Sequence, residues 1–374
     1  MELVDRFLKR LEKKSRGVAL SIFNGLNDDE KSFAANKSRK GKIMLHVYCK
    51  HATYDTIKDI SKYTCMIDHL DNKSQTPLFV AVERGNIEAS RALLERGADV
   101  NYCRPSRNYY GYKTRMWPLR TAIMSGNLEM VRLLIQFKVN LEVRDDIQET
   151  DHLLACKSGN KEIMYLLAQH LVDCNMVIGG YNESKKTYLH YAVKTRNYEL
   201  VDLLLSKGVN PNSVSHPHRG KGSKTAFVLA IENEDYEMVK KLAKGGAYIN
   251  LNFYYRFHAM TIAILMRNVK MVRLCLALGQ EVSTRDVKYV CKFNLYDIGV
   301  LIACEAINWY WVLGTYFISE PKTRKMQVLY YFTGLTMNYA WKDITLFETI
   351  DYYLQIQRER EKISSLKKQL KLAQ

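Results

Sequence analysis

The sequence predicts an all-α fold, a solenoid of about seven, or eight, helix-turn-helix units with long finger loops and additional helices at both ends. Three observations lead to this prediction. Apolar residues at helical spacing recur in blocks of similar length, each block contains signals that end two helices, and a short extended stretch follows. The composition, with 47% hydrophobic and 25% charged residues, is that of a folded protein.

The clearest unit covers residues 71–101. Thr76 can cap a helix whose first residue is Pro77, because proline lacks an N–H that would be unpaired at that position anyway. Gly85 and Gly97 can adopt a left-handed backbone conformation, so each is expected to end a helix. The unit therefore reads as helix, stop, helix, stop and extended finger.

The same block recurs downstream, and alanines at the equivalent helix position mark the later units: Ala122, Ala155, Ala192, Ala230 and Ala263. Successive alanines are separated by 33, 37, 38 and 33 residues, and a degenerate first unit begins at about Met44. Asp151 and Tyr188 stand where the clearest units have proline, so these units are expected to depend on their neighbours for stability.

This pattern resembles the ankyrin repeat, whose Thr-Pro-Leu-His-x-Ala and Gly-Ala-Asp-Val-Asn signatures are nearly complete in residues 76–101. The resemblance covers residues 44–284. It implies a stack of helix pairs that binds other macromolecules through finger tips and the exposed side of the inner helices. It also implies a structural hydrogen-bonding role for His190, which stands at the histidine of the pattern.

Four regions are expected along the chain. Residues 1–43 form a basic N-terminal helix with a polar linker or cap, and residues 44–284 form the repeat array. Residues 285–348 are either a degenerate repeat or a C-terminal helical cap. Residues 349–374 form a charged helix, either a short coiled coil that allows self-association or a helix that packs back on the array.

Residues 298–318 leave a further alternative open, because this stretch of apolar residues contains a single charge, Glu305. Its length reaches the threshold for a membrane span. It reads equally well as two helices of a degenerate repeat divided at Asn308.

The net charge of +17 predicts acidic partners, and the insertions into the repeat predict where they bind. The longest insertion follows Asn101 and carries arginine, lysine and tyrosine with no acidic residue. Two further basic or aromatic insertions cover residues 213–224 and 252–258. Tyrosine, tryptophan and arginine dominate binding hot spots, so these loops are the candidate interaction surface. The candidate residues are Tyr102, Arg104, Arg107, Tyr109, Tyr110, Tyr112, Lys113, Arg115, Trp117, His216, His218, Arg219, Lys221, Lys224, Tyr254, Tyr255 and Arg256.

These loops predict a non-enzymatic adaptor or scaffold that binds an acidic protein partner, with the concave face contributing. Basic and aromatic residues can also bind single-stranded nucleic acid, so a nucleic-acid-associated factor is the alternative. A membrane-associated protein anchored by residues 298–318 is the third class.

Catalytic, metal and cofactor sites are not expected. The eight cysteines contain no Cys-x-x-Cys pair, and His152 and Cys156 share a helical face without further ligands nearby in the sequence. Residues 220–225 resemble a phosphate-binding loop but lack the required glycine spacing. Scattered thiols and a charged start without a signal-peptide core predict a cytoplasmic or nuclear location.

Overall fold

The computed structural model describes residues 16–38, 41–107, 113–144, 149–178, 185–215, 223–250, 259–293, 295–305 and 346–372. The chain divides into two compact units. Unit 1 consists of Met1–Leu171 and Ile178–Asn182, and unit 2 consists of Val172–Val177 and Glu183–Gln374.

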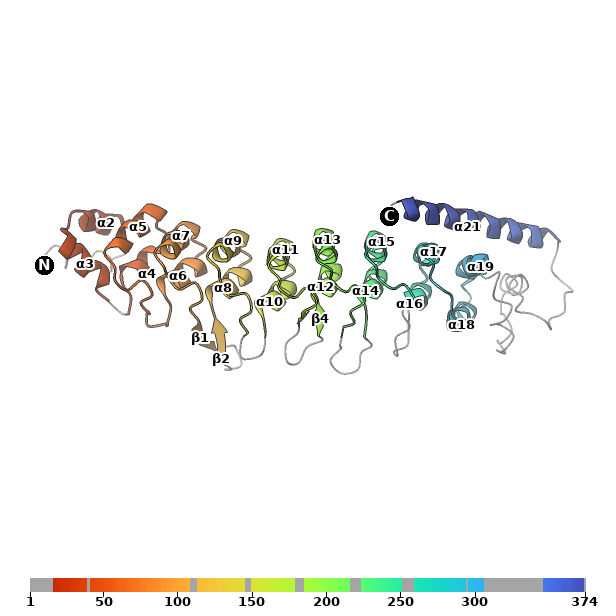
Figure 1. The fold of residues 1–374 in the computed structure, drawn as a ribbon, viewed down its shortest axis with the longest axis horizontal. Coiled ribbons are helices and arrows are strands. Elements are labelled where there is room, and N and C mark those ends of the chain that lie inside the picture. The colour runs from red at the N-terminus through yellow and green to blue at the C-terminus, as the bar shows by residue number, and fades with distance from the viewer. Residues whose placement is uncertain are drawn as a thin grey trace. The chain divides into compact units, whose positions relative to one another are not determined.

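Unit 1 is a stack of short helix pairs with one β-hairpin (Figure 1). Its elements are α2 (Arg16–Asn24), α3 (Asp28–Asn36), α4 (Met44–Tyr48), α5 (Tyr54–Lys62), α6 (Pro77–Glu83), α7 (Ile87–Glu95), β1 (Arg104–Arg107), β2 (Lys113–Met116), α8 (Pro118–Met124), α9 (Leu128–Gln136), α10 (Asp151–Ser158) and α11 (Lys161–Gln169). Inner helices α6, α8 and α10 pack in sequence, and outer helices α7, α9 and α11 form a second layer.

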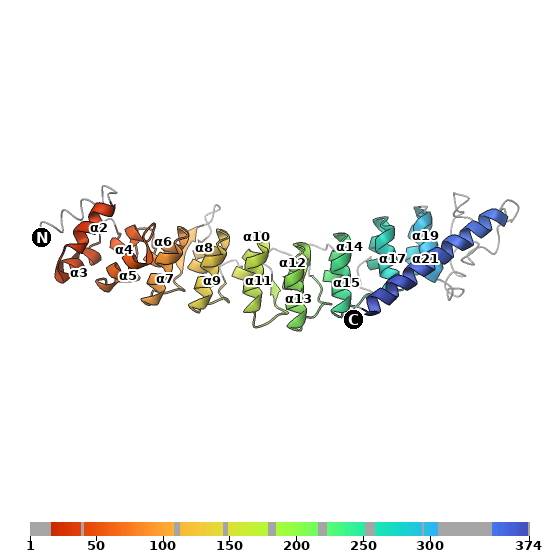
Figure 2. The same ribbon diagram turned by 90° about the horizontal axis from the view of Figure 1, so that it is seen from above.

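Unit 2 repeats this arrangement and adds a long terminal helix, and Figure 2 shows the helix pairs of each unit from above. Its elements are β4 (Lys186–Thr187), α12 (Tyr188–Lys194), α13 (Tyr198–Ser206), α14 (Ala226–Glu232), α15 (Tyr236–Lys244), α16 (Ala259–Leu265), α17 (Val269–Ala277), α18 (Thr284–Lys292), α19 (Tyr296–Glu305) and α21 (Leu346–Leu372). The short strand β3 (Val177–Ile178) precedes β4 in the sequence. Inner helices α12, α14, α16 and α18 contact one another in order.

Side-chain caps start the helices where the sequence predicts them. The Thr76 hydroxyl accepts a hydrogen bond from the Phe79 N–H at 3.1 Å, and Pro77 is the first residue of α6. Outer helices begin in the same way, with a side-chain oxygen that accepts from the backbone N–H three residues later: Asn86, Asn127, Asn160, Asn197, Asp235 and Asn268. Gly85 and Gly97 are left-handed, with φ of 68° and 85°. The helix, stop, helix, stop prediction is confirmed here.

The core of each unit lies between the helix layers. Leu78, Ala81 and Leu93 in unit 1 are fully buried, as are Ala192 and Leu204 in unit 2. Burial of such aliphatic side chains is the main stabilising term for helices too short to be stable alone.

Histidines tie neighbouring repeats together, as the resemblance implied for His190. The His190 Nε2 lies 2.9 Å from the carbonyl oxygen of Lys224, and its Nδ1 lies 2.8 Å from the Thr187 hydroxyl. His46 makes the equivalent bond to the carbonyl oxygen of Gln75 at 2.9 Å. Both rings are buried, so their role is structural.

The ends of the chain hold more helices than the predicted array. Helices α2 and α3 lie within residues 1–43, which were expected to form a basic N-terminal helix with a polar linker or cap, and α3 contacts α4. Helices α18 and α19 lie in the region expected to be a degenerate repeat or cap. Helix α21 packs on α17 and α19. This agrees with the expectation that the C-terminal helix packs back on the array. The exact domain boundaries stay a prediction.

No helix of the described residues is long and apolar enough to cross a membrane. Residues 298–305 of the stretch considered as a span belong to α19, which ends at Glu305. Residues 306–318 lie outside the described part of the chain.

Candidate interaction surface of the finger loops

The longest predicted finger in unit 1 is an antiparallel hairpin of β1 and β2. Its register pairs Arg104 with Met116, Pro105 with Arg115, Ser106 with Thr114, and Arg107 with Lys113. Directly paired residues lie on the same face of a β-ribbon, and successive residues alternate between faces. The register therefore places Arg107, Lys113 and Arg115 on one face, and Arg104 on the other.

This basic face concentrates like charges. Arg107 and Lys113 are directly opposite, and no acidic residue occurs between residues 100 and 129 of the sequence. Like charges directly opposite each other destabilise a hairpin. Arg115 is exposed.

The opposite face and the base of the hairpin are anchored to the preceding repeat. The Arg104 guanidinium lies over the Phe79 ring at 4.9 Å, a cation–π contact. The Tyr102 hydroxyl donates to the carbonyl oxygen of Ser74 at 3.1 Å. Two of the residues predicted to contact a partner, Tyr102 and Arg104, thus have contacts that hold the finger in position.

Trp117 does not lie on the candidate surface, which corrects one expectation. Its side chain is 2% exposed, and its indole N–H donates to Oδ2 of Asp151 at 2.6 Å. Trp117 is the N-cap residue of α8 and belongs to the core between repeats. The sequence placed this large apolar ring next to a basic loop, but burial in the following repeat is the stronger effect.

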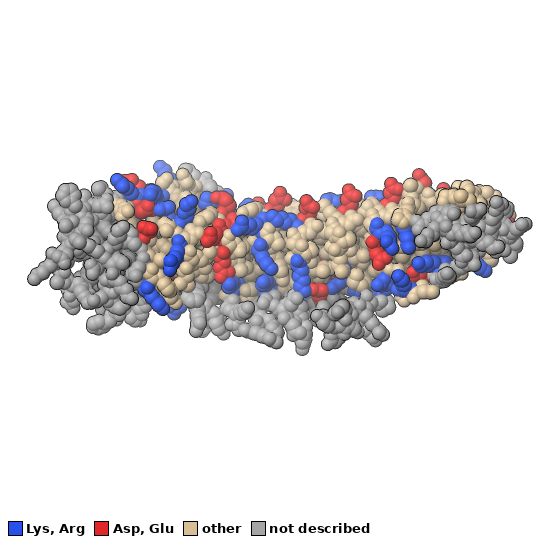
Figure 3. Space-filling view, turned by 180° about the vertical axis from the view of Figure 1, so that it is seen from behind, with Lys and Arg blue, Asp and Glu red and all other residues tan. Residues whose placement is uncertain are grey.

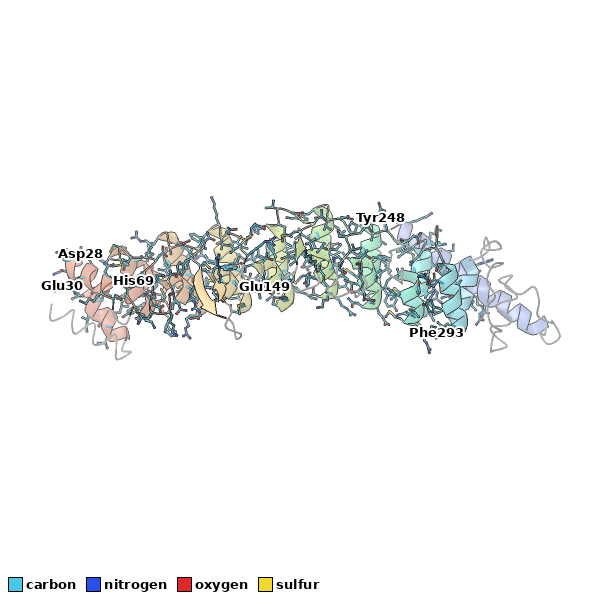
Figure 4. The ribbon with its side chains drawn as sticks, turned by 90° about the horizontal axis from the view of Figure 1, so that it is seen from below. Asp28, Glu30, His69, Glu149, Tyr248 and Phe293 are labelled. Atoms are coloured by element: carbon cyan, nitrogen blue, oxygen red, sulfur yellow. The ribbon has the colours of Figure 1, made fainter. Side chains whose placement is uncertain are left out.

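A buried charged cluster joins α8 to the start and end of α10 and was not predicted. The Glu149 carboxylate accepts a hydrogen bond from Arg120, and its second oxygen accepts from Lys157 at 2.6 Å. The Arg120 and Glu149 side chains are at most 10% exposed, and Arg120 also lies over the Trp117 ring at 5.3 Å. Figure 4 shows Glu149 on the finger side of unit 1. A lone Arg and a lone Glu separated by 29 residues gave no sequence signal for this pair.

In unit 2, Lys224 closes the base of a finger rather than extending from it. Its Nζ donates to both carboxylate oxygens of Glu232 at 2.6 and 2.8 Å. Its carbonyl oxygen accepts from the Ser215 N–H at 2.9 Å and binds His190. Lys224 therefore has a structural role, and its charge is already paired.

The remaining predicted site residues fall in parts of the chain that the structure does not describe, or describes only as backbone. Residues outside the described ranges are Tyr109, Tyr110, Tyr112, His216, His218, Arg219, Lys221, Tyr254, Tyr255 and Arg256. For Arg107 and Lys113 the structure describes the strand positions alone.

The charges of the described helices are mixed on one face of the molecule. On the face drawn in Figure 3, lysine and arginine are interspersed with aspartate and glutamate over the described helices of each unit. Mixed charges of this kind are typical of a solvated surface without a dominant field. On the hairpin of unit 1, by contrast, the sequence places basic residues on one face with no acidic residue between positions 100 and 129.

The titratable groups that the sequence raised as possible ligands are buried and neutral. Burial lowers the pKa of His152 to about 4 and raises the pKa of the Cys156 thiol. A thiol with a raised pKa is a poor nucleophile and a poor metal ligand. Within the described ranges, no group of three or more His, Cys, Asp or Glu side chains is arranged to hold a metal ion.

Comparisons with known proteins match the architecture. A family model described as ankyrin repeats in three copies matches residues 14–103 and 119–215, and a second, described as ankyrin repeats in many copies, matches residues 189–243. The first match begins ahead of residue 44, within the region that forms α2 and α3.

Individual relatives are more distant. The Homo sapiens transient receptor potential cation channel subfamily A member 1 is 25% identical over 229 residues, which are 58% of this chain and 19% of that protein. The Mus musculus B-cell lymphoma 3 protein homolog is 27% identical over 201 residues, which are 52% of this chain and 42% of that protein. The crystal structure of the ankyrin repeat domain of Bcl-3 is 20% identical, with a TM-score of 0.48, covering 63% of this chain and 99% of that one. This chain spans less than half the length of both curated relatives.

Proposed function

Since this chain belongs to the ankyrin-repeat family, whose members generally mediate protein–protein interaction, we propose that it is a non-enzymatic scaffold for an acidic protein partner. The partner binds the basic face of the β1–β2 hairpin, with the tyrosine-rich finger segments and the concave face contributing. One observation carries the proposal: the register places Arg107, Lys113 and Arg115 on one face of an acid-free finger.

The chemistry of this face favours a carboxylate-rich protein surface. Arginine forms two parallel hydrogen bonds with a carboxylate, and a hairpin with paired cations gains most from a partner that neutralises both strands. Two other cations near the finger already contact residues of the same chain, so the proposed site does not include them. Arg104 lies over the Phe79 ring, and Arg120 donates to the Glu149 carboxylate. The scattered free thiols of the described residues fit the predicted cytoplasmic or nuclear location.

The test compares two variants with the same loss of charge. The finger variant carries Arg107→Gln, Lys113→Gln and Arg115→Gln together. The control carries Arg91→Gln, Arg132→Gln and Lys138→Gln, three exposed cations on and after the outer helices of the same unit. Affinity purification from the native cell should recover an acidic protein with wild type and control, and the purified pair should bind at least tenfold more weakly with the finger variant. Equal binding of all three would overturn the proposal.

Nucleic acid is the alternative partner, because the same cations can neutralise phosphates. A 20-nucleotide single-stranded RNA titrated against the purified chain at about 50 and 200 mM salt separates the two classes. Binding that falls steeply with salt, shows no sequence preference and is lost in the finger variant would favour the nucleic-acid class. The lead proposal expects no binding of this RNA at the lower salt.

A further inference from the structure

The basic face of the hairpin and the Trp117 side chain lie on the same side of the strand. Trp117 directly follows β2, and its backbone is extended, with φ of −127° and ψ of 166°, so the pleat of β2 continues into this residue. Side chains two residues apart on a pleated strand point to the same side. The orientation of the Trp117 ring is therefore coupled to the direction in which the Arg115 side chain leaves the strand.

Two contacts fix the Trp117 ring. Its indole N–H donates to Oδ2 of Asp151 at 2.6 Å, and the Arg120 guanidinium lies over the ring at 5.3 Å. Trp117 and Arg120 are three residues apart at the start of α8, which places them on one side of that helix. All three side chains are buried, so the ring cannot reorient without breaking these contacts.

Glu149 holds Arg120 over the ring. Its carboxylate accepts a hydrogen bond from Arg120 with one oxygen and from the Lys157 ammonium with the other, the second at 2.6 Å. A guanidinium on a flexible side chain has many rotamers, and a buried carboxylate that accepts from it selects one of them. Without Glu149, Arg120 would lose both its charged partner and the contact that keeps it on Trp117.

The start of the hairpin is held independently of Glu149. The Tyr102 hydroxyl donates to the carbonyl oxygen of Ser74, and the Arg104 guanidinium lies over the Phe79 ring. These contacts are with the preceding repeat, whereas Glu149 and Asp151 belong to the following one. Loss of Glu149 should therefore release β2 and leave the start of β1 anchored.

We propose that Glu149 is a positioning residue for the basic face. It is buried and orients Arg115 through Arg120 and Trp117. This role rests on the proposed function, because it concerns how the same cations are presented to an acidic partner. A face that is held in one orientation before binding loses less conformational freedom when the partner docks, so its affinity is higher.

The experiment removes one member of the cluster at a time from the full chain. Glu149→Ala and Arg120→Met both break the link to Trp117. Lys157→Met removes the other cation bound to Glu149 and leaves that link intact, so it is the matched control. The double variant Glu149→Met with Arg120→Met leaves no unpaired charge in that pair, which covers the case in which Glu149→Ala does not fold.

The probe is a fluorescent peptide of ten glutamates, titrated at about 50 mM salt so that charge interactions are only weakly screened. Glu149→Ala and Arg120→Met should each weaken binding about fivefold, and the double variant should bind no more weakly than either. Lys157→Met should change binding less than about twofold. Glu149→Gln keeps an oxygen that can accept from Arg120, so it should restore binding to within about twofold of wild type.

Hydrogen exchange without the probe gives a second readout. The amides of β2 should exchange about tenfold faster in Glu149→Ala than in wild type, with those of α9 and α11 unchanged. Equal acceleration or equal loss of binding in Lys157→Met would indicate a general effect on stability and would overturn the proposal, as would unchanged exchange in Glu149→Ala. If the finger variant binds the probe as well as wild type does, the proposed function fails, while exchange in Glu149→Ala still decides whether Glu149 positions the hairpin.

Discussion

The indole N–H of Trp117 donates to the carboxylate of Asp151 at 2.6 Å, and both side chains are buried. This bond joins the N-cap residue of α8 to the first residue of α10, so it links the inner helices of two successive repeats. Asp151 stands where other units have proline, such as Pro77. In the sequence, Asp151 looks like a weak point because it replaces the proline of the repeat pattern. In the structure, the same residue forms a hydrogen bond that links two repeats.

We predict that Asp151→Ala destabilises unit 1 by about 2 kcal/mol, because it leaves a buried indole N–H without its acceptor. Asp151→Asn retains an acceptor oxygen, so its cost should be smaller, about 1 kcal/mol. Urea unfolding followed by circular dichroism measures both. A double-mutant cycle with Trp117→Phe should give a coupling energy above about 0.5 kcal/mol, and additive single changes would show that the bond contributes nothing.

The two arginines at the ends of the hairpin should behave differently on substitution. Arg104→Ala removes the contact with the Phe79 ring and should cost about 0.5–1 kcal/mol of stability, together with loss of amide protection in β1. Arg115→Ala changes an exposed residue, so stability should stay within about 0.5 kcal/mol while partner binding weakens. Thermal unfolding and binding of the purified partner separate the two effects. A reversed pattern would show that Arg115 is the anchor.

Local signals predicted the repeat because each signal acts within a few residues. Thr76, Pro77 and Gly85 each impose a backbone state on their own turn, and the structure has all three as expected. The sequence also shows that Arg107, Lys113 and Arg115 lie in a finger without acidic residues. It does not show that they share one face, because that depends on the register of the hairpin.

Contacts between distant residues could not be predicted. Glu149 meets Arg120 across 29 residues, and Glu359 meets Arg273 across 86. Whether α21 forms a coiled coil or packs on the array depends on the shape of a surface that appears only after α17 and α19 have stacked. Trp117 shows the opposite error. Its position next to a basic, tyrosine-rich loop suggested a binding residue, but the structure buries its side chain.

Acid should destabilise the repeat that contains His152. The folded-state pKa is about 4, below the ordinary value of 6.5, because burial disfavours the imidazolium. The unfolded chain therefore takes up a proton as the pH falls below 6.5, while the folded chain does not until about pH 4. Above pH 6.5 the titration of His152 does not reduce the free energy of unfolding. By pH 4 it has reduced this free energy by up to about 3 kcal/mol.

The variant His152→Leu isolates this effect, since leucine occupies the equivalent position in the clearest repeat, at Leu78. Between pH 6.5 and 4, the free energy of unfolding of this variant should depend less steeply on pH than that of wild type. The difference in slope should correspond to about one proton. Urea unfolding at several pH values measures the difference, and other titrating groups cancel in the comparison. Parallel pH profiles of the two proteins would show that His152 is not the group responsible.

Glu234 occupies a left-handed position, with φ of 52°, where Gly85, Gly126 and Gly159 stand in unit 1. A side chain with a β-carbon is strained there by about 1 kcal/mol, and glycine is not. We therefore predict that Glu234→Gly stabilises unit 2 by about 0.5–1 kcal/mol. Glu237→Gly, in the first turn of α15, removes the same charge from a helical position and should destabilise it by about 1 kcal/mol. Thermal unfolding of the two variants tests the sign directly, because a charge effect would shift both in the same direction, whereas backbone strain shifts them in opposite directions.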